Sequence, residues 1–215
     1  MKNKTLSDTL KKTYHKLFKA FGKQHWWPGE TQFEIIVGAI LTQNTAWTNV
    51  EKAIKNLKKA GALTPKRMHD LSQDELAKLI KPAGYFNIKA KRLKHFLNYL
   101  FDEYGGSLDR LFKKRADFLR KGLLLVNGIG PETADSILLY AGNHPVFVVD
   151  AYTQRIFSRH MIIDKEADYE EIQKVFMGNL PHEVKLFNEY HALIVRLGKD
   201  FCKNKKPLCN KCPMM

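Results

Sequence analysis

Cysteine is scarce in this sequence. Only three cysteines occur among 215 residues, and all of them, Cys202, Cys209 and Cys212, lie within the last fourteen positions. Thiols so few and so clustered exclude the disulfide framework of a small secreted domain. In a reducing compartment their clustering indicates metal ligation instead.

Long apolar runs and targeting segments are also missing. No stretch approaches the roughly 18 continuous apolar residues of a membrane span. The first residues, MKNKTLSDTLKKTYHKLF, contain neither an apolar core nor a small-residue cleavage site. We therefore expect a protein of the cytoplasm with no membrane partner.

Acidic residues are too few to balance the basic ones. The chain has 36 Lys and Arg against 22 Asp and Glu, a formal charge of +14. This surplus favours a polyanionic partner, most simply nucleic acid, although a merely soluble basic protein is the alternative. A hydrophobic content of 44% excludes a disordered chain. The length allows one large domain or two small ones.

Strand signals are almost absent, because the apolar period is helical nearly throughout. Apolar stripes of helical spacing occupy residues 50–57, 76–80, 93–104 and 187–195. Ser72 and Glu75 form a capping box before the second of them. VFVV (146–149) is the only strand-like run and is too short to found a sheet. The sequence, which has no internal repeat, predicts the all-α class.

A glycine-rich turn interrupts the helical pattern in LVNGIGPETADSILLY (125–140). We predict that one helix ends at Leu125 and that Pro131 opens the next, where its missing N–H costs nothing. Glycines permit positive φ, and the amides exposed at the helix start form an anion site. A DNA phosphate is the natural anion for a basic protein. An ordinary helical hairpin with nothing bound is the alternative.

An aspartate follows this hairpin. In PVFVVDAYTQRIF (145–157) an apolar run leads to Asp150 at the start of a new helix. A carboxylate in this position often only caps the helix. It can also stabilise a developing cation or activate water, so catalysis is the second interpretation.

The pattern L-x-x-x-x-G-I-G-P-x-T-A followed by V-D resembles the helix-hairpin-helix and aspartate signature of the endonuclease III superfamily of DNA base-excision glycosylases. The resemblance extends from about Phe33 to Cys212. It implies a six-helix barrel over residues 30–138 and a second helical domain formed by residues 1–29 and 139–215. It further implies a nucleoid-associated monomer that flips a base out of damaged double-stranded DNA, with Asp150 as the catalytic residue.

Glu132 occupies a position that separates two activities within this superfamily. In members that also cut the DNA backbone, a lysine in the first turn after the hairpin attacks the sugar and forms a Schiff base. Glu132 stands there in this sequence, and a carboxylate cannot form an imine. The resemblance therefore implies a monofunctional enzyme that leaves an abasic site. Glu132 itself is interpreted as an acid favoured by the helix dipole.

All three tryptophans lie in HWWPG (25–29) and LTQNTAW (41–47). Both segments resemble the branch of the superfamily that excises 3-methyladenine, in which Trp26, Trp27, Pro28 and Trp47 would line the base pocket. Indole faces attract a cationic base, although adjacent tryptophans also serve as core residues. Lys199 matches a lysine near that pocket, with a phosphate contact or a solvent-facing position as alternatives.

Two further segments resemble the DNA-contacting parts of the superfamily. Gln43 and Asn44 match the loop that fills the gap left by the flipped nucleotide, and the sequence does not separate them. One of the two can instead cap the next helix. Gly128, Gly130 and Thr133 of the hairpin would contact a DNA phosphate.

The spacing C-x6-C-x2-C of Cys202, Cys209 and Cys212 matches the first three ligands of the superfamily's [4Fe–4S] loop. Zinc would accept the same ligands. The sequence departs from the pattern because it has no fourth cysteine. The cluster is then incomplete, another ligand substitutes, or the chain is truncated.

These features predict a monofunctional DNA glycosylase for alkylated purines of the 3-methyladenine type. One alternative keeps the class but changes the lesion: an endonuclease III-like glycosylase and lyase for oxidised pyrimidines, or a mismatch-base glycosylase. Another is a DNA-binding hairpin module without activity. Glu132 argues against the usual lyases, and Asp150 in its motif argues against the module.

Overall fold

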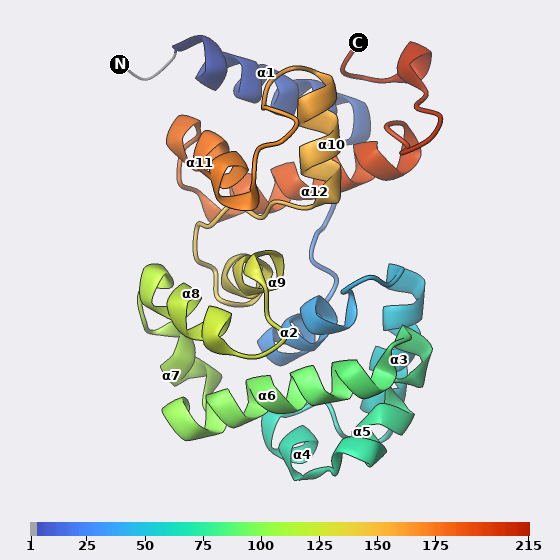
Figure 1. The fold of residues 1–215 in the computed structure, drawn as a ribbon, viewed down its shortest axis with the longest axis vertical. Coiled ribbons are helices and arrows are strands. Elements are labelled where there is room, and N and C mark those ends of the chain that lie inside the picture. The colour runs from blue at the N-terminus through green and yellow to red at the C-terminus, as the bar shows by residue number, and fades with distance from the viewer. Residues whose placement is uncertain (1–3) are drawn as a thin grey trace. The chain divides into compact units, whose positions relative to one another are not determined.

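The computed structural model describes residues 4–215, which form helices joined by turns and loops and contain no strand (Figure 1). The predicted all-α class is therefore confirmed. Within the same residues, none of the helices combines the length and the apolar character that crossing a bilayer requires.

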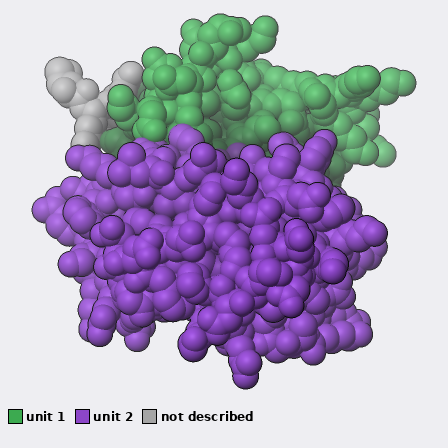
Figure 2. All heavy atoms as spheres, turned by 60° about the horizontal axis from the view of Figure 1, so that its bottom comes forward, with its two compact units in different colours: residues 1–27, 145–215 green, residues 28–144 purple. Residues whose placement is uncertain are grey.

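The described chain divides into two compact units, coloured separately in Figure 2. Unit 2 is the continuous segment Pro28–His144. Unit 1 combines the chain up to Trp27 with Pro145–Met215, so it is built from both ends of the sequence. The domain bounds and the six-helix barrel that the resemblance implied stay predictions.

Unit 2 contains most of the helices. In chain order they are α2 (Gln32–Leu41), α3 (Trp47–Lys59), α4 (Pro65–Asp70), α5 (Gln73–Leu79), the 3₁₀ turn η1 (Lys81–Ala83), α6 (Phe86–Tyr104), α7 (Leu108–Phe112), α8 (Ala116–Leu125), α9 (Pro131–Ser136) and the π-helical turn η2 (Ile137–Ala141). The predicted capping box is present at the start of α5, where the Ser72 side chain accepts from the Glu75 N–H and the Glu75 carboxylate accepts from the Ser72 N–H.

Helix α2 forms the centre of unit 2. Eight of its ten residues are buried, as expected for a helix that is apolar on nearly every side. It contacts α3, α6, α9 and η2. The Gln32 side chain donates to the carbonyl of Ala141 over 2.8 Å, so α2 also supports the segment that follows the hairpin.

The core of unit 1 is rich in aromatic side chains. Its helices are α1 (Lys4–Phe21), α10 (Ala151–Arg159), α11 (Tyr169–Asn179), α12 (Val184–Asp200) and the short η3 (Cys209–Lys211). The rings of Phe147 and Phe176 stack at 4.0 Å, and Phe187 meets Phe147 edge-on. Tyr190 donates from its hydroxyl to the carbonyl of Leu10. This bond joins α12 to α1 from the other end of the chain.

The strand-like run 146–149 is extended but pairs with side chains instead of a second strand. Gln173 donates from its side chain to the Phe147 carbonyl over 2.7 Å, and the Phe147 N–H donates to the sulfur of Met177. Because helix α11 satisfies these backbone groups, the buried run needs no sheet. It delivers Asp150 to the start of α10.

Candidate functional site

The Gly-Ile-Gly segment forms the tight turn that the sequence predicts. Helix α8 ends at Leu125 and α9 begins at Pro131. Gly128 has a φ of +92°, a conformation that side chains disfavour. A Cβ on Gly128 would also lie 2.3 Å from Cγ of Arg92, so the arginine stem packs directly on the turn. Gly130 has an ordinary φ and open space around it.

The two glycines should therefore respond differently to substitution. Gly128→Ala is expected to lower the free energy of unfolding by roughly 1–3 kcal/mol, from backbone strain and the clash with Arg92. Gly130→Ala should leave it nearly unchanged. Urea unfolding of the two variants measures the difference. Equal decreases in the free energy of unfolding of the two variants would contradict a specific role of the Gly128 backbone conformation in stability.

Gln43 connects the loop after α2 to this turn. Its amide nitrogen donates to the carbonyl of Gly128 over 3.0 Å and to the hydroxyl of Thr133 over 2.9 Å. Its amide oxygen accepts from the guanidinium of Arg92. Asn44, next in the chain, is exposed and has a left-handed φ of +52°. Within unit 2 the structure thus brings Gln43 together with Gly128 and the buried Thr133.

Asp150 is the N-cap of α10 in unit 1, and its side chain is 11% exposed. One carboxylate oxygen, Oδ1, accepts from the N–H of Thr153 over 2.7 Å and from its hydroxyl over 2.9 Å. The other, Oδ2, lies 3.6 Å from Nε2 of the buried His191. The cap interpretation and a reactive carboxylate are therefore compatible, because the two oxygens face different groups.

The surroundings of Asp150 keep it ionised. Burial alone would raise the pKa of Asp150, but His191 and the two hydrogen bonds from Thr153 outweigh burial and hold the pKa below its ordinary value of 3.8. Since the folded-state pKa is lowered, this carboxylate adds stability above pH 3.8 and loses that contribution as the pH falls through the lower folded value. At neutral pH the group is a carboxylate.

The tryptophans are divided between the units. Trp26 and Trp27 belong to unit 1, with ring centroids 5.2 Å apart in an edge-to-face pair. Pro28 and Trp47 belong to unit 2, where the indole N–H of Trp47 donates to the Glu51 carboxylate over 2.8 Å. Each unit therefore contributes aromatic surface of its own, and the base pocket made from both stays a prediction.

Two charged residues singled out by the resemblance are exposed. Glu132 lies in the first turn of α9, as expected for an acid near a helix start. Lys199 lies near the end of α12. Its neighbour Gly198 is buried and in close contact with Tyr152, since a Cβ there would lie 2.2 Å from Cδ1 of the Tyr152 ring. This close approach holds α12 against α10, the helix that Asp150 caps.

The cysteine segment does not fit a four-thiolate cluster. Cys202 is buried, Cys209 is exposed, and the chain contains only one more thiol, Cys212. Over residues 4–215 no group of three or more His, Cys, Asp or Glu side chains is arranged to hold a metal ion. The sulfur of Cys202 instead accepts from the guanidinium of Arg159 at 3.3 Å. The [4Fe–4S] ligand set expected from the resemblance is thus unsupported, and no chemical step is assigned to a cluster.

Arginines secure this C-terminal segment. Arg159 also donates to the carbonyls of Lys203 and Asn204, each over 2.8 Å. Arg155 donates to the carbonyl of Cys202 over 2.9 Å. Both arginines belong to α10, so the segment is bound to the helix that begins beside Asp150.

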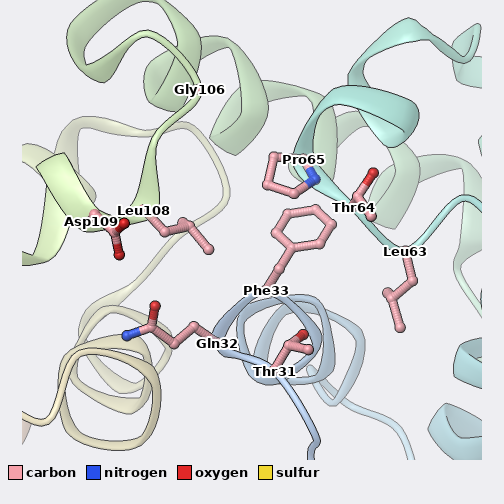
Figure 3. A pocket seen from close by; sticks show the side chains of 9 residues that line it. All are labelled: Thr31, Gln32, Phe33, Leu63, Thr64, Pro65, Gly106, Leu108 and Asp109. Atoms are coloured by element: carbon pink, nitrogen blue, oxygen red, sulfur yellow. The ribbon is translucent and has the colours of Figure 1, made fainter.

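One cavity of unit 2 is separate from these residues. It is a cavity of about 380 Å³ between the starts of α2, α4 and α7, with Phe33 and Pro65 facing each other inside it (Figure 3). Thr31 and Thr64 line this cavity. Their hydroxyls accept hydrogen bonds from backbone N–H groups and so cap α2 and α4. None of its lining residues is among those predicted for the site.

Sequence reasoning missed three residues of the site. Arg92 and Lys89 lie on α6, where only the apolar stripe was interpreted, and His191 was assigned to the apolar stripe of α12. A signal for Lys89 was its position four residues before Leu93, on the same helix face as the start of that stripe. No local pattern in the sequence predicts that His191 lies beside Asp150, because 41 positions separate them.

Comparison with known proteins identifies the family of this chain. The family model described as HhH-GPD superfamily base excision DNA repair protein matches residues 37–182. A Methanocaldococcus jannaschii protein with the provisional name DNA repair glycosylase MJ1434 is 48% identical over 209 residues, which cover 96% of this chain and 94% of the relative. Endonuclease III of Sulfolobus acidocaldarius is 30% identical over 84% of this chain and 78% of its own.

Solved structures show the same fold. The 3-methyladenine DNA glycosylase MagIII of H. pylori, solved with 1,N6-ethenoadenine, superposes with a TM-score of 0.76 at 30% identity, covering 93% of this chain and 98% of that one. A trapped endonuclease III–DNA covalent intermediate gives 0.83 at 22% identity, covering 96% and 92%. The similarity to the endonuclease III structure is a similarity of fold alone. From its matched residues and its relatives, this chain belongs to the HhH-GPD superfamily of base excision DNA repair proteins.

Proposed function

We propose that this protein is a monofunctional DNA glycosylase that removes alkylated purines of the 3-methyladenine type from damaged duplex DNA. The observation that carries the proposal is the largely enclosed Asp150, held by Thr153 through one oxygen and ionised at neutral pH. Membership of a base excision repair family supplies the context for its chemistry.

Asp150 would act through charge and through water. Breaking an N-glycosidic bond places positive charge on the sugar, and a fixed carboxylate in a dry site stabilises that charge strongly. Because Oδ1 accepts both bonds from Thr153, Oδ2, which lies 3.6 Å from Nε2 of His191, is the oxygen that would orient the attacking water. The water adds to C1′ and gives one proton to Oδ2 of Asp150, while the bond from C1′ to the base breaks and the cationic base departs as a neutral molecule with the bonding electrons.

The proposal excludes strand cleavage by a Schiff base. Glu132 stands in the first turn of α9, where the lyase members of the family carry a lysine, and a carboxylate forms no imine. An alkylated purine suits such an enzyme because a cationic base is already a good leaving group. The edge-to-face pair of Trp26 and Trp27 in unit 1 supplies indole surface on which such a base can stack.

Asn44 is the better candidate for filling the gap left by the flipped base. Gln43 uses both ends of its amide inside the protein, on Arg92, Gly128 and Thr133. Asn44 is exposed at the tip of the same loop. An Asn44→Ala variant should therefore bind an abasic-site duplex more weakly, while its fold is unchanged.

A panel of duplexes, each carrying one lesion, tests the function. After incubation with the protein, strand breaks are compared with and without alkali. Breaks at 3-methyladenine that need alkali are expected, and borohydride should trap no protein–DNA adduct, with endonuclease III as the positive control. Breaks without alkali, or a trapped adduct, would identify a lyase instead.

The second candidate is an endonuclease III-type enzyme for oxidised pyrimidines. The Sulfolobus acidocaldarius relative of that name, at 30% identity, favours it. The same panel distinguishes the two, because excision would then occur at oxidised pyrimidines and leave alkylated purines intact.

A further inference from the structure

A lysine in unit 2 is buried, and its ammonium donates to two carbonyl oxygens and one hydroxyl. Lys89, on α6, is 1% exposed. Its ammonium donates to the carbonyl of Leu41 over 2.8 Å, to the carbonyl of Ala83 over 2.9 Å, and to the hydroxyl of Thr45. An ammonium has three protons, so these three acceptors satisfy it completely.

The three acceptors belong to three different segments. Leu41 is the last residue of α2, Thr45 lies in the loop between α2 and α3, and Ala83 ends η1. The Thr45 hydroxyl in turn donates to the Ala83 carbonyl over 2.7 Å. A single side chain of α6 therefore fixes both the beginning and the middle of the loop that contains Gln43 and Asn44.

Arg92, one turn further along α6, connects the same loop to the hairpin. Its guanidinium donates to the Gln43 amide oxygen, and its stem packs on Gly128. Gln43 then donates to the carbonyl of Gly128. A second contact from α6 to the turn is made by His95, whose ring nitrogen lies 3.0 Å from the carbonyl of Asn127.

We infer that Lys89 and Arg92 are positioning residues, which hold the loop of residues 42–46 and the hairpin turn of residues 127–130 as one preassembled DNA-binding surface. The inference rests on the proposed function for its biological meaning. Its structural content, a rigid loop attached to the turn, is independent of any particular lesion.

Preassembly has a thermodynamic reason. A loop that must be ordered on binding loses conformational freedom at that moment, and a loop already fixed does not.

Burial, with a smaller contribution from the charge of Arg92, lowers the pKa of Lys89 to about 8. The ammonium therefore persists at neutral pH, where it can donate all three bonds.

The matched control lies on the same helix. Lys94 also donates to backbone carbonyls, of His69 over 2.6 Å and of Met68, and burial lowers its pKa as well. It secures the end of α4 and does not contact the loop or the turn through these bonds. Lys94→Met thus removes the same charge and the same kind of bond at another place.

The experiment compares the full-length protein with its Lys89→Met, Gln43→Met and Lys94→Met variants. Hydrogen–deuterium exchange without DNA is measured at residues 42–46 and 127–130. Binding is measured to a duplex with a tetrahydrofuran abasic-site analogue and to the matching intact duplex. Lys89→Met and Gln43→Met should each speed exchange about tenfold at both segments and reduce the preference for the abasic duplex about fivefold. Lys94→Met should change neither.

The outcomes separate this inference from the proposed function, since no measurement requires turnover. If Lys89→Met does not fold, Gln43→Met still cuts the connection between loop and turn. Unchanged exchange in the folded variants would overturn the inference. So would an equal effect of Lys94→Met, because it would indicate general loosening of unit 2.

Discussion

Replacing Asp150 with asparagine is expected to slow base removal by at least about 100-fold, since a fixed carboxylate beside a developing cation is worth that much or more. The fold should survive, because asparagine caps a helix as well as aspartate does and its amide oxygen can accept the bonds from Thr153. Single-turnover excision with excess enzyme measures the rate, and fluorescence anisotropy with an abasic-site duplex measures the retained affinity.

Asp168 provides the matched control for this substitution. It is also an N-cap aspartate of unit 1, accepting from the Glu171 N–H over 2.8 Å, but it is exposed. Asp168→Asn should excise at the normal rate. An Asp150→Asn enzyme with undiminished single-turnover excision would remove Asp150 from the chemistry and leave it as a cap only.

Replacing Arg120 with methionine is expected to lower the free energy of unfolding by roughly 3–5 kcal/mol, the usual cost of breaking a buried ion pair. Arg120 of α8 donates to both carboxylate oxygens of Asp135, over 2.7 and 3.1 Å. The Asp135 side chain is fully buried in α9. The pair joins the two helices that flank the Gly-Ile-Gly turn, so urea unfolding should report the loss directly.

Arg115 makes a similar bidentate ion pair at the exposed start of α8. It donates to both oxygens of Asp117, over 3.1 and 3.0 Å, with side-chain exposures of 85% and 61%. Surface pairs of this kind contribute little, so Arg115→Met should unfold like the unmodified protein. Similar losses from both substitutions would mean that burial does not set the strength of the Arg120 pair.

Local features of the sequence predicted much of the fold. The capping box at Ser72 and the helix stop at Leu125 depend on residues three or four positions apart, whose chemistry acts within one turn. The class followed from the same local periodicity. The hairpin turn was predictable because a positive φ at Gly128 and a proline at the next helix start have few alternatives.

The site was less predictable, because its contacts join distant positions. Gln43 meets Gly128 across 85 residues, and Lys89 meets Leu41 across 48. A lysine or arginine on a helix is normally assigned to solvent, so the sequence did not lead us to predict the contacts of Lys89 and Arg92 with the loop. The cysteine spacing favoured a cluster on family grounds, while within residues 4–215 no group of three or more His, Cys, Asp or Glu side chains is arranged to hold a metal ion.

The division of the chain has a consequence for synthesis on the ribosome. Unit 2 is one continuous segment and can begin to fold as soon as it emerges. Unit 1 must wait, since the Ser7 side chain bonds the carbonyl of Asn179 and Tyr190 bonds that of Leu10. We therefore expect the nascent protein to form its hairpin first and the surroundings of Asp150 last.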